Sequence, residues 1–206
     1  MIVPETEETR EHAAKLIANG RIIAFRTDTF YGLGVDPFNP VAVARLRELK
    51  QQDDGKPILL LISDPSDLDR LIVDRSARFE VVTKKFWPGP LTIVCRAAGG
   101  LPNGLTACTG TVGVRLPNDE NVRALVRLCG GALTATSANL SGSPPARSAE
   151  EVEGYFPTGV DLIIDSGEVA ATEPSTVLDL SQAEARVIRE GAVSRKMLEG
   201  VLGGAL

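Results

Sequence analysis

Histidine is almost absent from this chain of 206 residues, in which His12 is the single example. A Ser-His-Asp or Cys-His triad uses a histidine as its base, and His12 lies in a segment that we expect to form a surface helix. The sequence therefore excludes such a triad and also a histidine-rich zinc site. Any chemistry must depend on cations, hydroxyls, carboxylates or an added metal.

Cysteine and long apolar runs are also scarce. Cys95, Cys108 and Cys129 are far apart and form no Cys-x-x-Cys pair, which is typical of free thiols in a reducing compartment. Residues 1–8 are acidic where a signal peptide would be basic. No apolar run approaches the roughly 18 residues of a membrane-spanning helix. We therefore expect a cytoplasmic protein that makes no contact with a membrane.

Positive charge is not in excess, because 22 Lys and Arg stand against 27 Asp and Glu, a net charge of −5. This balance argues against a nucleic-acid protein driven by bulk electrostatics, although a local basic patch stays compatible with it. Hydrophobic residues make up 43% of the chain and charged residues 24%, which is ordinary for a globular protein. A chain of this length can bury a core without disulfides or metals.

Apolar runs and helix-capping residues alternate along the first two thirds of the chain, and strands dominate afterwards. Expected strands cover 21–25, 58–62, 91–95, 111–117, 161–165, 175–180 and 185–189; expected helices cover 8–19, 41–50, 67–72, 75–86, a segment from a cap at Asn118 to Cys129, a short segment after Ser148, and 194–201. Residues 101–110 read as irregular. The pattern predicts an α/β fold with a twisted mixed sheet.

Two strands are predicted to end in clusters of short polar side chains. Residues 134–145 read TATSANLSGSPP, and residues 26–34 read RTDTFYGLG. Ligands bind beyond the carboxyl ends of strands in open α/β sheets. Because Ser, Asn, Gly and Pro also form ordinary turns, the composition leaves both interpretations open.

Eight pieces of the sequence together resemble the YrdC family, specifically its stand-alone threonylcarbamoyl-adenylate synthases. In chain order they are residues 27–34, 46–50, 56–57, 87–92, 111–117, 136–142, 175–177 and 189–191. The resemblance implies a single YrdC-like domain over residues 1–206, with a motif-bearing core at about 8–195, a C-terminal helix at about 194–202 and no further C-terminal domain. It implies a twisted mixed parallel and antiparallel sheet with flanking helices and a cationic concave site.

The same resemblance implies an activity and its partners. L-threonine, bicarbonate and ATP would condense to threonylcarbamoyl-AMP with release of pyrophosphate. A partner transferase would then move the threonylcarbamoyl group to tRNA, and weak binding of tRNA or other RNA by this chain is compatible with that role. Mg²⁺ would arrive with ATP, and no metal is expected to be held by the protein itself.

Site residues follow from the resemblance position by position. The catalytic signature Lys-x-Arg...Ser-x-Asn corresponds to Lys50, Ser137 and Asn139; the ATP-binding positions are Gln52, Lys56, Thr111, Ser137, Asn139, Ser143 and Arg189; the threonine-binding positions are Thr29, Arg115 and Ser175. Each has a plainer alternative. Lys50 ends a helix and could stabilise its dipole. Arg115 and Arg189 could form structural salt bridges, and the hydroxyls could belong to turns.

One departure from the family pattern stands in the signature itself. The position of its arginine is occupied by Gln52, which can donate hydrogen bonds but carries no charge. Arg26 stands where a proline usually precedes Thr27. We expect Arg26 or Lys56 to replace part of the missing positive charge.

Two other functions remain open at the level of sequence. The first is a non-catalytic RNA-binding or ribosome-maturation module of the same fold, which would show a steep salt dependence of its RNA affinity. The second is a carbamoyl-transfer domain like that of hydrogenase-maturation proteins, which would be accompanied by zinc-finger and acylphosphatase modules.

Overall fold

The computed structural model describes residues 1–51, 57–140 and 142–204. In this part of the chain, strands are β1 (Ile2–Pro4), β2 (Ile23–Arg26), β3 (Tyr31–Gly34), β4 (Leu59–Ile62), β5 (Leu91–Arg96), β6 (Thr111–Arg115), β7 (Ala132–Thr134), β8 (Thr136–Ser137), β9 (Leu162–Asp165), β10 (Thr176–Asp179) and β11 (Arg186–Arg189). Helices are α1 (Glu7–Ala18), α2 (Pro40–Lys50), the 3₁₀ helix η1 (Pro65–Arg70), α3 (Ala77–Phe86), α4 (Asn103–Thr106), α5 (Glu120–Leu128), α6 (Ala149–Tyr155) and α7 (Arg195–Leu202).

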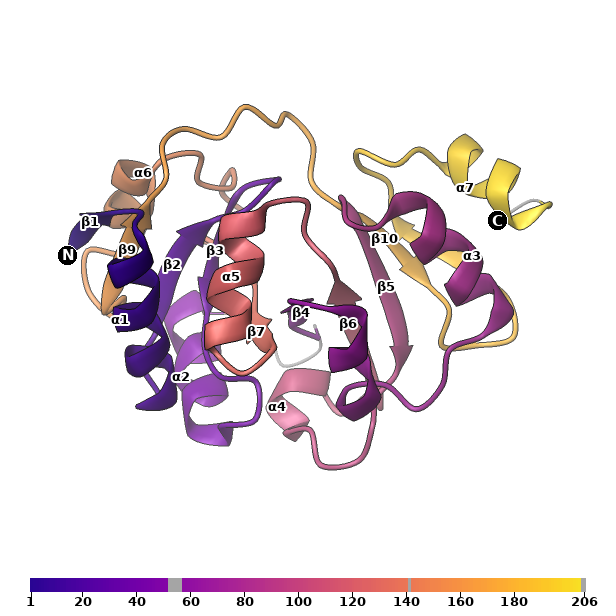
Figure 1. Ribbon diagram of the computed structural model, residues 1–206, viewed down its shortest axis with the longest axis horizontal. Coiled ribbons are helices and arrows are strands. Elements are labelled where there is room, and N and C mark those ends of the chain that lie inside the picture. Colours follow the sequence, from indigo (N-terminus) through magenta and orange to yellow (C-terminus); the bar gives the residue numbers. More distant parts are fainter. Residues whose placement is uncertain (52–56, 141, 205–206) are drawn as a thin grey trace.

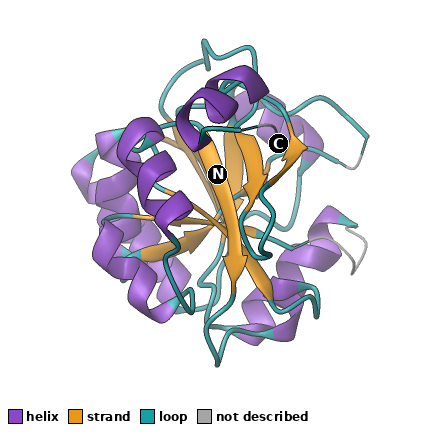
Figure 2. Ribbon diagram, turned by 90° about the vertical axis from the view of Figure 1, so that its right-hand side faces the viewer, coloured by secondary structure: helices purple, strands orange, loops and turns teal. Residues whose placement is uncertain are grey.

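The described strands form two mixed sheets, whereas the sequence predicted one. Sheet A has the order β1-β9-β2-β3-β8 and sheet B the order β11-β10-β5-β6-β4-β7. In Figure 1, sheet A lies with α1, α2 and α6 in the half that holds the N-terminus, and β5 and β10 of sheet B lie with α3 and α7 in the other half. The segment between β9 and β10 arches over both halves. Figure 2 shows the strands inside and the helices around them.

A short stretch of chain connects the edges of the two sheets. β7 pairs with β4 in sheet B, and two residues later β8 pairs with β3 in sheet A. Between them, the amide of Ala135 donates to the carbonyl of Leu59. The buried hydroxyl of Thr134 accepts the amide of Val35 at 2.8 Å. The start of the segment 134–145, which the sequence allows to be either an ordinary turn or a ligand site, is thus also the junction of the two sheets.

The core consists of two packed clusters of apolar side chains. The larger cluster includes Leu60, Ile93 and Val114 of sheet B, which are completely buried. The smaller cluster packs α1 and α5 onto sheet A and the junction, with Ile17, Val122, Leu125, Phe25 and Leu133 among its members. Among the described residues, no helix has the length and apolar character that a membrane crossing requires.

Most expected elements are present within one or two residues, and the exceptions have physical reasons. Asp119, not Asn118, caps α5, because its carboxylate accepts the amides of Asn121 and Val122. Asn118 instead donates its own amide to Asp28. Residues 101–110 are not wholly irregular, since they contain α4.

Candidate functional site

One face of sheet B is only partly covered, and Gly113 lies in its middle. A Cβ on Gly113 would lie 3.3 Å from the Thr92 side chain, 3.8 Å from that of Leu59 and 3.9 Å from that of Val94. Leu59 and Val94 are half-buried. Thr111 and Arg115 share this face because they stand two residues either side of Gly113 in β6. A glycine at this position leaves room for a ligand close to the backbone.

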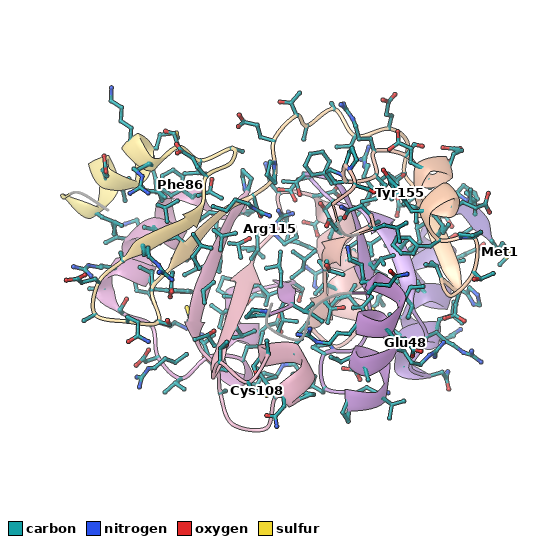
Figure 3. All side chains as sticks on the ribbon, turned by 180° about the vertical axis from the view of Figure 1, so that it is seen from behind. Met1, Glu48, Phe86, Cys108, Arg115 and Tyr155 are labelled. Carbon is teal, nitrogen blue, oxygen red and sulfur yellow. The ribbon has the colours of Figure 1, made fainter. Side chains whose placement is uncertain are left out.

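Arg115 is a buried cation at the end of β6 nearest sheet A. Its side chain is 2% exposed, and it donates through Nη2 to Asp28 Oδ1 at 2.6 Å and through Nη1 to Thr29 Oγ1 at 3.1 Å. Burial lowers the pKa of Arg115, Asp28 opposes that shift and Arg189 adds to it. Figure 3 places Arg115 near the middle of the molecule, between the half that carries Tyr155 and the half that carries Phe86.

The loop between β2 and β3 holds Thr29 in a rigid turn. The hydroxyl of Thr27 accepts the amides of Thr29 and Phe30 and lies 2.7 Å from the carbonyl of Phe30. The Thr27 and Thr29 hydroxyls are 3.0 Å apart, and both residues are buried. Threonine hydroxyls stabilise such turns by bonding to the backbone close by. The predicted threonine-binding residues Thr29 and Arg115 are therefore in direct contact.

Ser175 and Arg189 form a second group next to the first. Arg189 donates through Nη2 to the carbonyl of Ser175 at 2.7 Å and to its hydroxyl at 3.2 Å. The hydroxyl of Ser175 also lies 3.0 Å from that of Thr92. The sequence assigned Ser175 to threonine and Arg189 to ATP. The structure brings the two into contact, and the charge of Arg189 contributes to lowering the pKa of Arg115.

Lys50, at the end of α2, reaches the turn that follows β8. Its ammonium donates to the carbonyls of Ser137 and Asn139, at 2.5 and 2.7 Å, and to Asn139 Oδ1 at 3.3 Å. An ammonium has three donors, so each of them has an acceptor in the protein. Lys50 is 6% exposed, and this burial lowers its pKa from 10.5 to about 8.

Ser137 and Asn139 are likewise bonded to each other and to the rest of the turn. The Ser137 hydroxyl donates to Asn139 Oδ1 at 2.5 Å, and Asn139 Nδ2 donates to the carbonyl of Ser143 at 2.6 Å. Lys50, Ser137 and Asn139, which come from distant parts of the chain, thus contact one another. Their mutual bonds also fit the turn that the sequence left open.

The remaining predicted residues have varied placements. Thr111 lies at the far end of β6 from Arg115, with its hydroxyl 2.7 Å from that of Thr109. Gln52 and Lys56 lie outside the described residues. Arg26, a proposed replacement for the missing arginine charge, has its guanidinium 3.7 Å from the Asp119 carboxylate. Arg26 therefore already has an anionic neighbour.

Three residues of the candidate site were not assigned a role from the sequence. Thr27 and Asp28 are the two residues that precede Thr29, and Thr92 follows Leu91 at the start of β5. Asp28 had one signal, since it is the only carboxylate within the polar strand end 26–34. Its pairing with Arg115 is a contact between residues 87 positions apart, which sequence spacing does not reveal.

Metal sites and hollows elsewhere give no better candidate. Across the described ranges, no group of three or more His, Cys, Asp or Glu side chains is arranged to hold a metal ion. A hollow between α2 and α4 is lined by Arg47, Glu48, Asn103 and neighbouring residues. Its lining includes none of the predicted site residues that the structure describes. The hydroxyls and arginines around Gly113 and the turn after β8 therefore remain the candidate site.

Comparison with known proteins gives one consistent family. The family model Sua5_yciO_yrdC, described as telomere recombination, matches residues 15–191. Threonylcarbamoyl-AMP synthase of Idiomarina loihiensis is 39% identical over 176 residues, which cover 84% of this chain and 93% of that protein. Threonylcarbamoyl-AMP synthase of Pyrococcus abyssi is 35% identical over 191 residues, which cover 93% of this chain and 56% of that protein.

A solved structure has the same fold over the whole chain. The crystal structure of P. abyssi Sua5 complexed with L-threonine superposes with a TM-score of 0.95 at 33% identity, covering 100% of this chain and 62% of that one. The chain spans little more than half the length of the Pyrococcus synthase. It matches the Idiomarina protein over nearly all of that protein's length. The chain belongs to the Sua5/YciO/YrdC family.

Proposed function

We propose that this protein is an L-threonylcarbamoyladenylate synthase, a nucleotidyltransferase that joins L-threonine, bicarbonate and ATP. The observation that carries the proposal is that Arg115 contacts Thr29, while Arg189 contacts Ser175, whose hydroxyl lies 3.0 Å from that of Thr92 beside Gly113. A buried arginine among hydroxyls suits the carboxylate and hydroxyl of an amino acid. The relatives named threonylcarbamoyl-AMP synthase support the same reading.

The proposed reaction proceeds in two steps. The amine of L-threonine attacks bicarbonate to give a carbamate with loss of water. A carbamate oxygen then attacks the α-phosphate of ATP, and the bond from that phosphorus to the bridging oxygen breaks, so that pyrophosphate leaves. The reacting groups are anions that repel one another, so positioning and cations dominate the catalysis. Mg²⁺ enters with ATP as part of that substrate.

Threonine binding is assigned to the residues around Arg115. Its guanidinium would hold the threonine carboxylate, since arginine binds carboxylates with charge-assisted hydrogen bonds. Thr29 and Ser175 would orient the rest of the amino acid. A buried hydroxyl that hydrogen-bonds the threonine hydroxyl would discriminate against valine far more strongly than an apolar pocket. Because Gly113 has no side chain, it leaves space above the backbone of β6 next to these groups.

ATP binding is assigned to the other polar groups of the site. Thr111, Ser137, Asn139, Ser143 and Arg189 would contact the nucleotide, with Gln52 and Lys56 completing the set. Lys50 would act by fixing Ser137 and Asn139, because its ammonium donates to both of their carbonyls. In this role Lys50 is a positioning residue rather than a phosphate ligand.

The product is a mixed anhydride of a carbamate and a phosphate, which is reactive towards nucleophiles. We propose that a partner transferase uses it to modify tRNA, so this chain needs no tight RNA site of its own. Its net charge of −5 is consistent with that division of labour. A cytoplasmic location would keep the thiols of Cys95, Cys108 and Cys129 reduced, and these thiols are free in the structure.

Pyrophosphate release from ATP tests the proposal. We expect release to require both L-threonine and bicarbonate, and to fall when L-valine or L-serine replaces L-threonine. Bicarbonate-depleted buffer and a reaction without amino acid are the controls. Release that continues equally in either control would contradict the proposed activity.

A further inference from the structure

The guanidinium of Arg115 is held by a carboxylate that has no assigned role in the proposed reaction. Asp28 Oδ1 accepts Arg115 Nη2 at 2.6 Å, while Asp28 Oδ2 accepts the amide of Asn118 at 3.2 Å. Both oxygens of one side chain are therefore used, one by the cation and one by the backbone that follows β6. The Asp28 side chain is 12% exposed, so water screens this pair only weakly.

The backbone around Asp28 is equally constrained. Asp28 lies between Thr27 and Thr29 in the turn that the Thr27 hydroxyl closes. The Thr29 hydroxyl accepts a hydrogen bond from Arg115 Nη1 at 3.1 Å and also lies 3.0 Å from the Thr27 hydroxyl. One tripeptide thus fixes Arg115 at both terminal nitrogens. Because two attachments are needed to set the plane of a guanidinium, Asp28 and Thr29 together define its orientation.

The guanidinium still has binding capacity after these contacts. Arginine carries five N–H donors, and the hydrogen bonds of Arg115 to Thr29 and Asp28 use Nη1 and Nη2. Within the described chain, Arg115 Nε is buried and has no hydrogen-bond partner. A buried donor without an acceptor is costly, and such groups in native proteins call for an explanation. An anionic ligand brought against this guanidinium would supply the charge and acceptors that the protein leaves out.

We infer that Asp28 is a positioning residue that orients Arg115 for the carboxylate of the amino-acid substrate; this inference rests on the proposed function. The alternative is that Asp28 occupies the place of the substrate carboxylate and is displaced when threonine binds. Its second bond to the Asn118 amide and its place in the Thr27 turn favour a carboxylate that stays in place. Loss of Asp28 therefore weakens the binding of threonine and leaves the binding of ATP unchanged.

Asp161 provides a matched control. Its Oδ2 accepts the amide of Ile22 at 2.8 Å, and its Oδ1 lies 3.4 Å from Arg21 Nη1. It thus resembles Asp28 in pairing with an arginine and with a backbone amide. It stands next to β9 in sheet A, and its carboxylate contacts Arg21 and Ile22, which are not among the predicted site residues. Asp161→Asn removes the same charge as Asp28→Asn without touching Arg115.

The experiment compares wild type, Asp28→Asn and Asp161→Asn by calorimetric titration with L-threonine, and by KM for L-threonine and for ATP in pyrophosphate release. Asp28→Asn should weaken threonine binding and raise its KM by at least about tenfold, the scale of one charge-assisted hydrogen bond, while KM for ATP stays within about twofold. Asp161→Asn should leave both constants as in wild type. Thermal unfolding of the two variants reports any general loss of structure.

The outcomes separate the inference from the proposed function. Wild type that neither binds L-threonine nor releases pyrophosphate overturns the function, and the inference with it. Wild type that does both, with Asp28→Asn binding threonine equally well or more tightly, overturns the inference alone. Equal rises in both KM values of Asp28→Asn would also overturn it, because a disturbed fold, and not an oriented Arg115, would explain them.

Discussion

The ammonium of Lys50 donates to three oxygens of a turn that lies 87 to 89 residues away in the chain. A lysine at the end of a helix usually needs no such partner, because the helix dipole and water suffice. Here the side chain is buried, and its acceptors are the residues assigned to the nucleotide. At the scale of single residues, the candidate site depends on side chains that orient others.

Replacing Lys50 by methionine tests this role. Lys50→Met keeps much of the side-chain volume but removes the ammonium from the Asn139 carbonyl and from the Ser137 carbonyl, which still accepts the amide of Asn139. We expect a loss of stability of about 1–3 kcal/mol, as for other buried groups left unpaired, and a rise of at least about tenfold in KM for ATP. Urea unfolding and steady-state kinetics measure the two effects.

Lys15→Met is the control for this substitution. Lys15 also lies in the last turn of a helix, α1, but it is exposed. Its replacement should change stability by no more than about 0.5 kcal/mol and leave the kinetics as in wild type. If Lys50→Met matched Lys15→Met in both measurements, the proposal that Lys50 positions Ser137 and Asn139 would be wrong.

The buried ammonium also predicts a dependence of stability on pH. Burial lowers the pKa of Lys50 from 10.5 to about 8 in the folded protein. Between these values the unfolded chain binds more protons than the folded one, so the free energy of unfolding rises with pH. We expect wild type to gain stability relative to Lys50→Met from about pH 8 to about pH 10.5. A difference between the two proteins that stays constant, or shrinks, over this range would contradict the shift.

At the scale of elements, β6 carries the site and the β7–β8 connection joins the sheets. The two-residue period of a strand puts Thr111, Gly113 and Arg115 on one face of β6, and the register of β6 with β4 and β5 agrees with that. The same strand contributes Val112 and Val114 to the core on its other face. β6 therefore packs into the core through one face, while Thr111 and the Gly113 neighbours Leu59 and Val94 on the other face are only half-buried.

A substitution at Gly113 tests the ligand-binding role of one face of β6 separately from the packing of the other. Its Cβ would lie 3.3 Å from the buried Thr92 side chain, which would have to shift by a few tenths of an ångström. We expect Gly113→Ala to change stability by less than about 1 kcal/mol, because alanine suits a strand better than glycine does. The added methyl group would reduce the space for the substrates and should lower kcat/KM for L-threonine and ATP by about tenfold or more. Chemical denaturation and initial rates give the comparison.

Gly34→Ala is the matched variant in sheet A. A Cβ there would lie 2.8 Å from the Phe25 ring and 3.1 Å from the carbonyl of Thr134, so the crowding falls in the core and on the backbone. We expect a loss of stability of about 1–3 kcal/mol, typical of overpacking. Full activity in Gly113→Ala would show that no ligand approaches this part of the sheet.

Local sequence patterns predicted the elements well but not their assembly. The helices expected at 41–50 and 194–201 begin within one residue of α2 and α7. The division into two sheets escaped prediction, because it depends on Ala135, where the chain passes from one sheet to the other within a single polar run. Capping preferences also did not separate Asn118 from Asp119, since both side chains are good caps.

The sequence supplied candidate residues for the site but not the contacts between them. Resemblance to a family supplied Lys50, Arg115, Ser137 and Asn139, none of which periodicity would have selected. Asp28 escaped because a salt bridge between distant segments leaves no trace in local spacing. The roles of Gln52 and Lys56 stay predictions.

At the scale of the whole molecule, the two sheets bring the proposed threonine and nucleotide groups together. Thr29 comes from sheet A and Arg115 from sheet B, while Lys50 reaches the junction between them. The segment between β9 and β10 crosses from one half to the other and leads to Ser175 (Figure 1). The relative position of the sheets therefore decides whether the proposed substrates can meet.

The central claim is that one carbon atom passes from bicarbonate into an adenylate that also contains threonine. The most direct measurement is mass spectrometry of the nucleotide product made from ¹³C-labelled bicarbonate, L-threonine and ATP. The account predicts an adenylate that contains threonine and carries the label, formed in the same amount as pyrophosphate. An unlabelled adenylate, or pyrophosphate formed without any such product, would contradict it.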